Sequence, residues 1–110
     1  MSTSRIELRA VAATRVEITD DSLTVELDDG RMISVPVAWY PRLSHGSREE
    51  RNNWRLIGRG EGIHWPDLDE DLTVAGLLEG KRSGESGSSL KKWLASRKPA
   101  KPAKGRITRR

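Results

Sequence analysis

The sequence contains no cysteine and no phenylalanine, and it has a single tyrosine among its 110 residues. Without cysteine the chain can form neither a disulfide nor a thiolate metal site, and it has no cysteine nucleophile. Apolar residues make up only 35% of the chain, and four tryptophans are the main large side chains for a core. We therefore predict a small core and at least one disordered segment.

Long apolar runs are also missing. No stretch approaches the roughly 20 apolar residues that a membrane-spanning helix needs. The N-terminal residues 1–18 lack the continuous apolar segment of a secretory signal. We therefore expect a cytoplasmic protein that makes no contact with a membrane.

The excess of basic over acidic residues is confined to the C-terminus. Residues 97–110 contain seven basic residues and no acidic ones, so residues 1–96 hold thirteen basic and sixteen acidic residues, a net charge of −3. This tail is low in complexity and contains proline, and we expect it to be disordered. The candidate nucleic-acid-binding residues of the tail are Arg97, Lys98, Lys101, Lys104, Arg106, Arg109 and Arg110.

Alternating apolar residues predict three strands near the start of the chain. The alternation runs through residues 16–18, 23–27 and 33–37. A period of two with β-branched residues is typical of strands that bury one face. Asp29 and Gly30 form a strong hairpin signal, because glycine accepts the positive φ of a tight turn. We therefore predict an antiparallel three-stranded β-meander.

Shorter elements are predicted after the meander. Ser47 with Glu50 three residues later matches a capping box at the start of a short helix. Two brief strands are expected at WRLIG (54–58) and GIHW (62–65). A helix that ends at Gly80 follows, with Asp71 or Thr73 as its cap, and SSLKKWLASR (88–97) predicts an amphipathic turn or two.

The predicted fold class is α+β. It has an antiparallel three-stranded β-meander, then short helices and two further short strands, and a disordered basic C-terminal tail. The predicted parts are an N-terminal extension (1–13), an α+β domain (14–80), a connector with a short amphipathic helix (81–96) and the tail (97–110).

Residues 62–72, GIHWPDLDEDL, place a histidine beside a tryptophan and four carboxylates within five positions. A calcium loop would need glycine where Leu72 stands and a bidentate glutamate where Leu78 stands. Zinc sites usually draw on several histidines or cysteines, and His45 shows no matching spacing with His64. We therefore expect neither a metal nor a cofactor.

Acid–base catalysis by Glu61, His64 and Asp67 is a further hypothesis. It requires a water-excluding cleft, for which so short a chain has little volume. We therefore predict no catalytic residues and keep a small hydrolase as the least favoured alternative. The carboxylates of residues 67–71 are interpreted as an acidic lead-in that caps the next helix, with the further option that they face a basic partner.

Three stretches resemble the bacterial domain-of-unknown-function family 2442: VAWYPRL (37–43), residues 48–80 and SGESGSSLKKWL (83–94). The most specific part is NWRLIGRGEGIHWPDLDEDL (53–72). The resemblance implies a small α+β domain with a β-meander. Family members are typically short bacterial proteins, and many are encoded beside another small domain in a toxin–antitoxin-like arrangement. The resemblance supplies no catalytic residues.

The leading hypothesis is a non-enzymatic protein-interaction module, in particular the antitoxin-like member of a two-gene module whose partner is encoded by a neighbouring gene. The alternative is nucleic-acid binding or autoregulation through the basic tail. Tryptophan and arginine are favoured in interface cores, although Trp54 and Trp65 also suit a core without phenylalanine. The candidate partner surface comprises Trp39, Tyr40, Arg42, Trp54, Arg55, His64, Trp65, Asp67 and Asp69.

Overall fold

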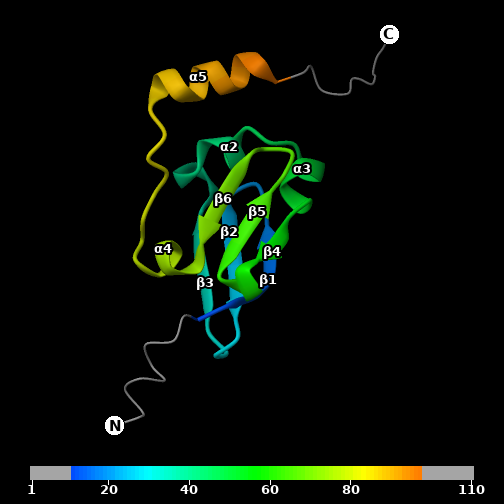
Figure 1. Ribbon diagram of the computed structural model, residues 1–110, viewed down its shortest axis with the longest axis vertical. Coiled ribbons are helices and arrows are strands. Elements are labelled where there is room, and N and C mark those ends of the chain that lie inside the picture. The colour runs from blue at the N-terminus through cyan, green and yellow to red at the C-terminus, as the bar shows by residue number, and fades with distance from the viewer. Residues whose placement is uncertain (1–10, 98–110) are drawn as a thin grey trace.

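The computed structural model describes residues 11–97, which form an α+β domain with two antiparallel sheets (Figure 1). Sheet A consists of β1 (Ala13–Ile18), β2 (Ser22–Leu27) and β3 (Met32–Pro36). Sheet B consists of β4 (Arg55–Ile57), β5 (Gly62–Trp65) and β6 (Glu70–Thr73). The other elements are η1 (Val37–Trp39), α2 (Pro41–Ser44), α3 (Arg48–Asn52), η2 (Gly58–Gly60), α4 (Val74–Leu78) and α5 (Gly87–Ser96).

Sheet A is the predicted meander, in the order β1-β2-β3, and this prediction is confirmed. The central strand β2 buries Leu23, Val25 and Leu27, because alternate side chains of a strand point to the same face. The hairpin to β3 turns at Gly30, which has a φ of +93°. The Gly30 amide donates to the Leu27 carbonyl at 3.1 Å, so the Asp29-Gly30 signal correctly located the turn.

Sheet B has one strand more than the sequence predicted. The two predicted strands form β4 and β5, but residues 70–73 form a third strand, β6, and only its last residue, Thr73, caps the helix that follows. Leu68 is fully buried in the turn before β6, and β6 then runs back along β5 with Asp71 opposite His64. The interpretation of residues 67–71 as a helix-capping lead-in is therefore wrong, because burial of Leu68 turns the chain back onto the sheet.

The predicted helix caps are confirmed. The Ser47 hydroxyl accepts from the Glu50 amide at 3.1 Å, and the Glu50 carboxylate accepts from the Ser47 amide at 2.9 Å. Of the two candidate caps for α4, the structure selects Thr73, whose Oγ1 accepts from the Gly76 amide at 3.0 Å. Gly80 follows α4 with a φ of +76°, as expected for a glycine that ends a helix.

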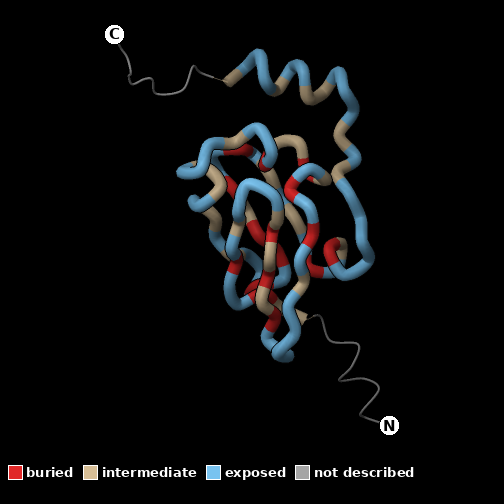
Figure 2. The backbone as a smooth tube through the Cα atoms, turned by 180° about the vertical axis from the view of Figure 1, so that it is seen from behind, coloured by how far each residue is buried: buried red, intermediate tan, exposed pale blue. Residues whose placement is uncertain are grey.

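The hydrophobic core lies between the two sheets and joins them into one unit, as the buried segments of the body show in Figure 2. Its largest fully buried side chains are Trp65 from β5 and Tyr40 from the loop before α2. Each sends its polar tip to a backbone carbonyl: Trp65 Nε1 donates to Arg51 at 2.9 Å, and the Tyr40 hydroxyl donates to Lys81 at 2.8 Å. Both aromatic residues are therefore buried without an unsatisfied donor.

Two predicted segments fall largely outside the described residues. These are the N-terminal extension, of which residues 11–13 are described, and the basic tail, of which only Arg97 is described. Within residues 11–97 no helix combines the length and the apolar character needed to cross a membrane.

Gly60 allows the β4–β5 connection to approach β1 closely. Its φ is +89°, and a Cβ placed on it would lie 2.6 Å from the carbonyl oxygen of Ala13. A side chain at this position would therefore need both an unfavourable backbone conformation and a displacement of β1.

We expect Gly60→Ala to lower the free energy of unfolding by about 3 kcal/mol, because strain and steric overlap add. Gly30→Ala is the matched control, since Gly30 also has a positive φ but a Cβ there would meet no atom within 4 Å. The control should cost only about 1 kcal/mol. Urea denaturation of both variants measures the difference, and equal losses would refute the steric role of Gly60.

Candidate functional site

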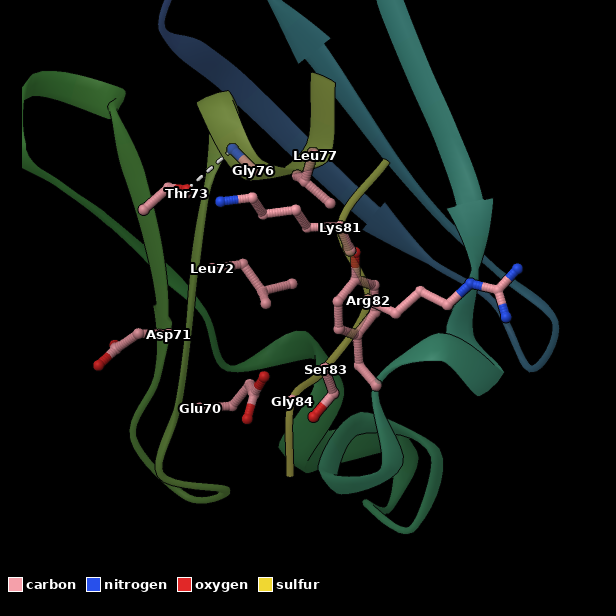
Figure 3. Close-up of a pocket in the computed structure, with 11 residues that line it drawn as sticks. Glu70, Asp71, Leu72, Thr73, Gly76, Leu77, Lys81, Arg82, Ser83 and Gly84 are labelled. Carbon is pink, nitrogen blue, oxygen red and sulfur yellow. Dashed lines mark hydrogen bonds between the residues drawn. The ribbon is translucent and has the colours of Figure 1, made fainter. Parts of the chain in front are cut away.

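The two faces of β6 present carboxylates to different surroundings. Successive side chains of a strand point to opposite faces. Asp71 and Thr73 are exposed on the outward face of sheet B, whereas Glu70 and Leu72 are partly buried on the inward face (Figure 3). Glu70 and Asp71, which are adjacent in sequence, therefore lie on two different surfaces of the domain.

On the outward face a row of polar side chains crosses all three strands of sheet B. Arg55 of β4 lies opposite His64 of β5, which in turn lies opposite Asp71 of β6. His64 Nδ1 and Asp71 Oδ1 are 2.5 Å apart, so the carboxylate orients the imidazole. At the end of the same sheet Asn53 donates to Asp67 at 2.9 Å. The row is open to solvent and presents a guanidinium, an imidazole and a carboxylate together.

In the portion of the chain that the structure describes, no three histidine, aspartate or glutamate side chains gather in a way that could hold an ion. The exposed groups of the row can form hydrogen bonds and ion pairs with an incoming polar surface.

On the inward face Glu70 borders a pocket of about 260 Å³. The pocket lies between β6, α4 and the segment 81–84 that leaves α4 (Figure 3). Its residues are Tyr40, Glu70, Asp71, Leu72, Thr73, Gly76, Leu77, Lys81, Arg82, Ser83 and Gly84.

Burial raises the pKa of Glu70 to about 7. The positive charge of Arg42 opposes this rise, and the carboxylates of Glu85, Asp71 and Asp69 add to it. Arg42 itself forms its ion pairs with Glu85 and Asp69. Glu70 is therefore a carboxyl group that changes charge close to neutral pH.

Arg42 also attaches α5 to the body of the domain. Its Nε and Nη2 donate to Glu85 at 2.9 and 2.6 Å, and its Nη1 donates to the Asp69 carbonyl at 3.0 Å. Its guanidinium lies 5.0 Å from the ring centroid of Trp93 in α5. Arg97 lies 4.6 Å from the same centroid and donates to Glu50 at 2.8 Å. These contacts are all polar or cation–π interactions.

No residue of α5 is fully buried, and Figure 2 accordingly shows no buried segment in this helix. Trp93 is partly buried and packs against the core, while Leu94 remains exposed. Since little apolar surface is covered, the attachment of α5 depends on charged side chains more than on hydrophobic burial.

The residues of the candidate partner surface predicted from the sequence lie in separate parts of the structure. Arg55, His64 and Asp67 lie on or beside the outward face of sheet B, and Trp54 directly precedes β4. Arg42 and Asp69 form a separate cluster at the attachment of α5. Trp39 is partly buried, and the Arg82 guanidinium lies 4.4 Å from its ring centroid.

Two members of that predicted surface need correction. Tyr40 and Trp65 are 2% and 0% exposed, so neither side chain is available to a partner. The reason is that the core lacks phenylalanine and uses these two aromatic rings in its place. Of the predicted tail residues only Arg97 is described, and its guanidinium contacts Glu50 and Trp93; the other six lie outside the described residues.

Sequence reasoning missed Glu70, Asp71 and Glu85 as members of a site. The alternation in EDLT (70–73) was the available signal for β6, but it contains a single large apolar residue and follows a run of acids. Nothing in the local sequence indicates that Glu85 pairs with Arg42, because this contact spans 43 positions of the chain.

Two three-stranded sheets around one core, with a helix held at the edge, define a small α+β domain. The chain belongs to the family described as "Protein of unknown function (DUF2442)", whose model matches residues 13–83. The resemblance inferred from the sequence is thereby confirmed. No curated protein matches the chain.

Two solved structures are similar to this one. A protein of unknown function from Rhodospirillum rubrum is 24% identical with a TM-score of 0.61, over 70% of this chain and 95% of that one. An uncharacterised protein from Chromobacterium violaceum is 21% identical with a TM-score of 0.59, over 86% and 81%. At these identities the likeness shows a shared fold.

We predict that the domain loses stability as the pH rises from 5 to 8. The folded-state pKa of Glu70, about 7, lies above its ordinary value of 4.5, so the folded state holds the proton more tightly through this window. The loss should be about 1–2 kcal/mol, reduced by solvent screening of a partly exposed group. Glu70→Gln should remove this contribution, and urea denaturation at both pH values measures it. An unchanged pH dependence in the variant would contradict the assignment.

We predict that Arg42→Met loosens α5 without unfolding the sheets. The variant keeps an apolar side chain but removes the guanidinium that contacts Glu85 and Trp93. Amide hydrogen exchange in α5 should accelerate roughly five-fold, which corresponds to about 1 kcal/mol. Arg55→Met removes an exposed guanidinium elsewhere and should leave exchange in α5 unchanged. Equal protection of α5 in the two variants would show that Arg42 does not hold the helix.

Proposed function

We propose that this protein is a non-enzymatic protein-interaction module and that its partner binds the outward face of sheet B. The observation that carries the proposal is the open row of Arg55, His64 and Asp71 across three strands. Among the described residues no helix covers this face in Figure 1. A sheet surface that carries both signs of charge can select a partner by electrostatic complementarity.

Ile57 supplies an apolar element to this face. Its side chain is 42% exposed although it is a large hydrophobic residue, and it lies opposite Gly62 beside the polar row. A rigid sheet that combines an exposed aliphatic residue with an arginine has the composition favoured at the centre of protein interfaces. Ile57 and Arg55 are therefore the anchors that we propose for the partner.

The surroundings of His64 and Asp71 favour binding over catalysis. A histidine paired with a carboxylate can act as a general base, but efficient proton transfer needs a site that excludes water. Here both side chains lie on an open face, with 27% and 65% of their surfaces exposed. This supports an interface role for the pair.

The partner that we propose is the product of a neighbouring gene, with this chain as the antitoxin-like member of the pair. The support is the gene arrangement that the family resemblance implies. Nucleic-acid binding through the tail, residues 97–110, is the competing proposal, and of that tail only Arg97 is described. The experiment must therefore separate the sheet from the tail.

The test is co-purification of the tagged full-length protein from its host, followed by mass spectrometry and affinity measurement with the recovered partner. The variant Arg55→Glu should weaken binding at least about ten-fold, because it places a carboxylate where the partner meets a guanidinium. Arg15→Glu is the matched control: it makes the same charge reversal on an exposed residue of β1.

A third variant lacking residues 98–110 completes the design. Full binding by this variant and by Arg15→Glu, with loss in Arg55→Glu, would support the sheet interface. Loss only on removal of the tail would support the competing proposal. Recovery of no partner at either low or high salt would refute the interaction module itself.

A further inference from the structure

Two hydrogen bonds between residues far apart in the sequence position the segment 81–84, which forms one wall of the pocket beside β6. The Tyr40 hydroxyl donates to the Lys81 carbonyl at 2.8 Å, and the Ser83 amide donates to the Trp39 carbonyl at 3.1 Å. Both bonds tie the segment 81–84 to the buried region around Tyr40 and not to β6. Among the described strands β6 is the edge strand of sheet B, and the pocket lies between it and the segment 81–84.

The walls of this pocket combine apolar and hydroxyl groups around the carboxyl of Glu70. Leu72 and Leu77 are apolar, and Ser83 contributes a hydroxyl group (Figure 3). Tyr40 also lines the pocket. Glu70 is the partly buried acid of the pocket, and within residues 11–97 it forms no ion pair. An alkyl chain that ends in a charged group is complementary to this pocket, because its apolar stem can lie on the apolar wall while its charged end lies near Glu70.

The charges around Glu70 favour a cation over an anion. From β6 and the turn before it, the carboxylates of Asp71 and Asp69 act on Glu70, and Glu85 acts on it from the segment before α5. Arg42 of α2 is the opposing charge, and its guanidinium is already paired with Glu85 and Asp69. A second positive charge would therefore stabilise the ionised form of Glu70.

Among residues 11–97 two cations line the pocket, Lys81 and Arg82, and neither forms an ion pair with Glu70. The Lys81 side chain extends toward Thr73 and Gly76 in Figure 3, and its Nζ lies 3.4 Å from the carboxylate of Glu79, which does not line the pocket. The Arg82 guanidinium lies over the Trp39 ring. Within the described part of the chain the Glu70 carboxyl is thus left without a paired cation.

We propose that the pocket between β6 and residues 81–84 binds an organic cation, an alkylammonium or guanidinium group, that pairs with Glu70. The cation comes either from a lysine or arginine side chain of a protein or from a free amine. This site lies on the opposite side of β6 from the proposed partner interface, so the proposal stands independently of it.

The experiment is a titration of the isotope-labelled full-length protein, followed by the amide signals of Gly76, Ser83 and Gly84. The probe is Nα-acetyl-lysine amide, and Nα-acetyl-norleucine amide is its uncharged counterpart with the same stem length. We expect saturable shifts with the lysine probe at pH 8. The norleucine probe should bind at least about ten-fold more weakly, because it lacks the charge that pairs with Glu70.

Glu70→Gln and Glu17→Gln form the matched pair of variants. Glu17 is an exposed glutamate of β1, far from the pocket residues in sequence and in a different sheet. Glu70→Gln should lose binding, and Glu17→Gln should keep it. Between pH 8 and pH 6 the wild-type affinity should fall about ten-fold, because Glu70 takes up a proton, and this dependence should vanish in Glu70→Gln.

The free diamine putrescine separates the two sources of the cation. Tighter binding of the lysine amide would assign the site to a protein side chain, and tighter binding of putrescine would assign it to a free amine. Equal binding of the norleucine probe, or unchanged binding by Glu70→Gln, would overturn the proposal. Binding that appears only in Lys81→Met would also overturn it, since the chain's own lysine would then fill the site.

Discussion

The packing of two aromatic rings between the sheets is the constraint on which the rest of the molecule depends. Without phenylalanine, the largest fully buried side chains are Trp65 and Tyr40. Each carries a polar group that needs a partner when buried. Trp65 therefore binds the backbone at the end of α3, and Tyr40 binds the backbone at Lys81. The second bond holds the chain after α4 and so forms the wall of the pocket.

The short strand β6 determines how the acidic run is used. Because β6 pairs with β5, its side chains alternate between the outward face and the pocket. Asp71 then lies beside His64 in solvent, while Glu70 loses much of its hydration and changes its proton affinity. A helix over the same residues would have placed neighbouring acids about 100° apart on one surface, without this separation.

The attachment of α5 has a different physical basis from the packing of the sheets. The sheets share buried aliphatic and aromatic side chains, whereas α5 is held by Arg42, Glu85, Trp93 and Arg97. Such contacts weaken with salt and contribute modestly when partly exposed. The core and the helix should therefore respond differently to ionic strength, with the sheets as the more stable part.

Local patterns in the sequence were sufficient for the meander, its hairpin at Gly30, the capping box at Ser47 and the family. Each of these depends on neighbours along the chain, where period, turn chemistry and capping act. The tertiary structure alone decided that Tyr40 and Trp65 are buried, that residues 70–73 pair as a strand, and that Arg42 meets Glu85. These outcomes depend on contacts between distant segments, because a side chain's burial and charge environment are set by what packs against it.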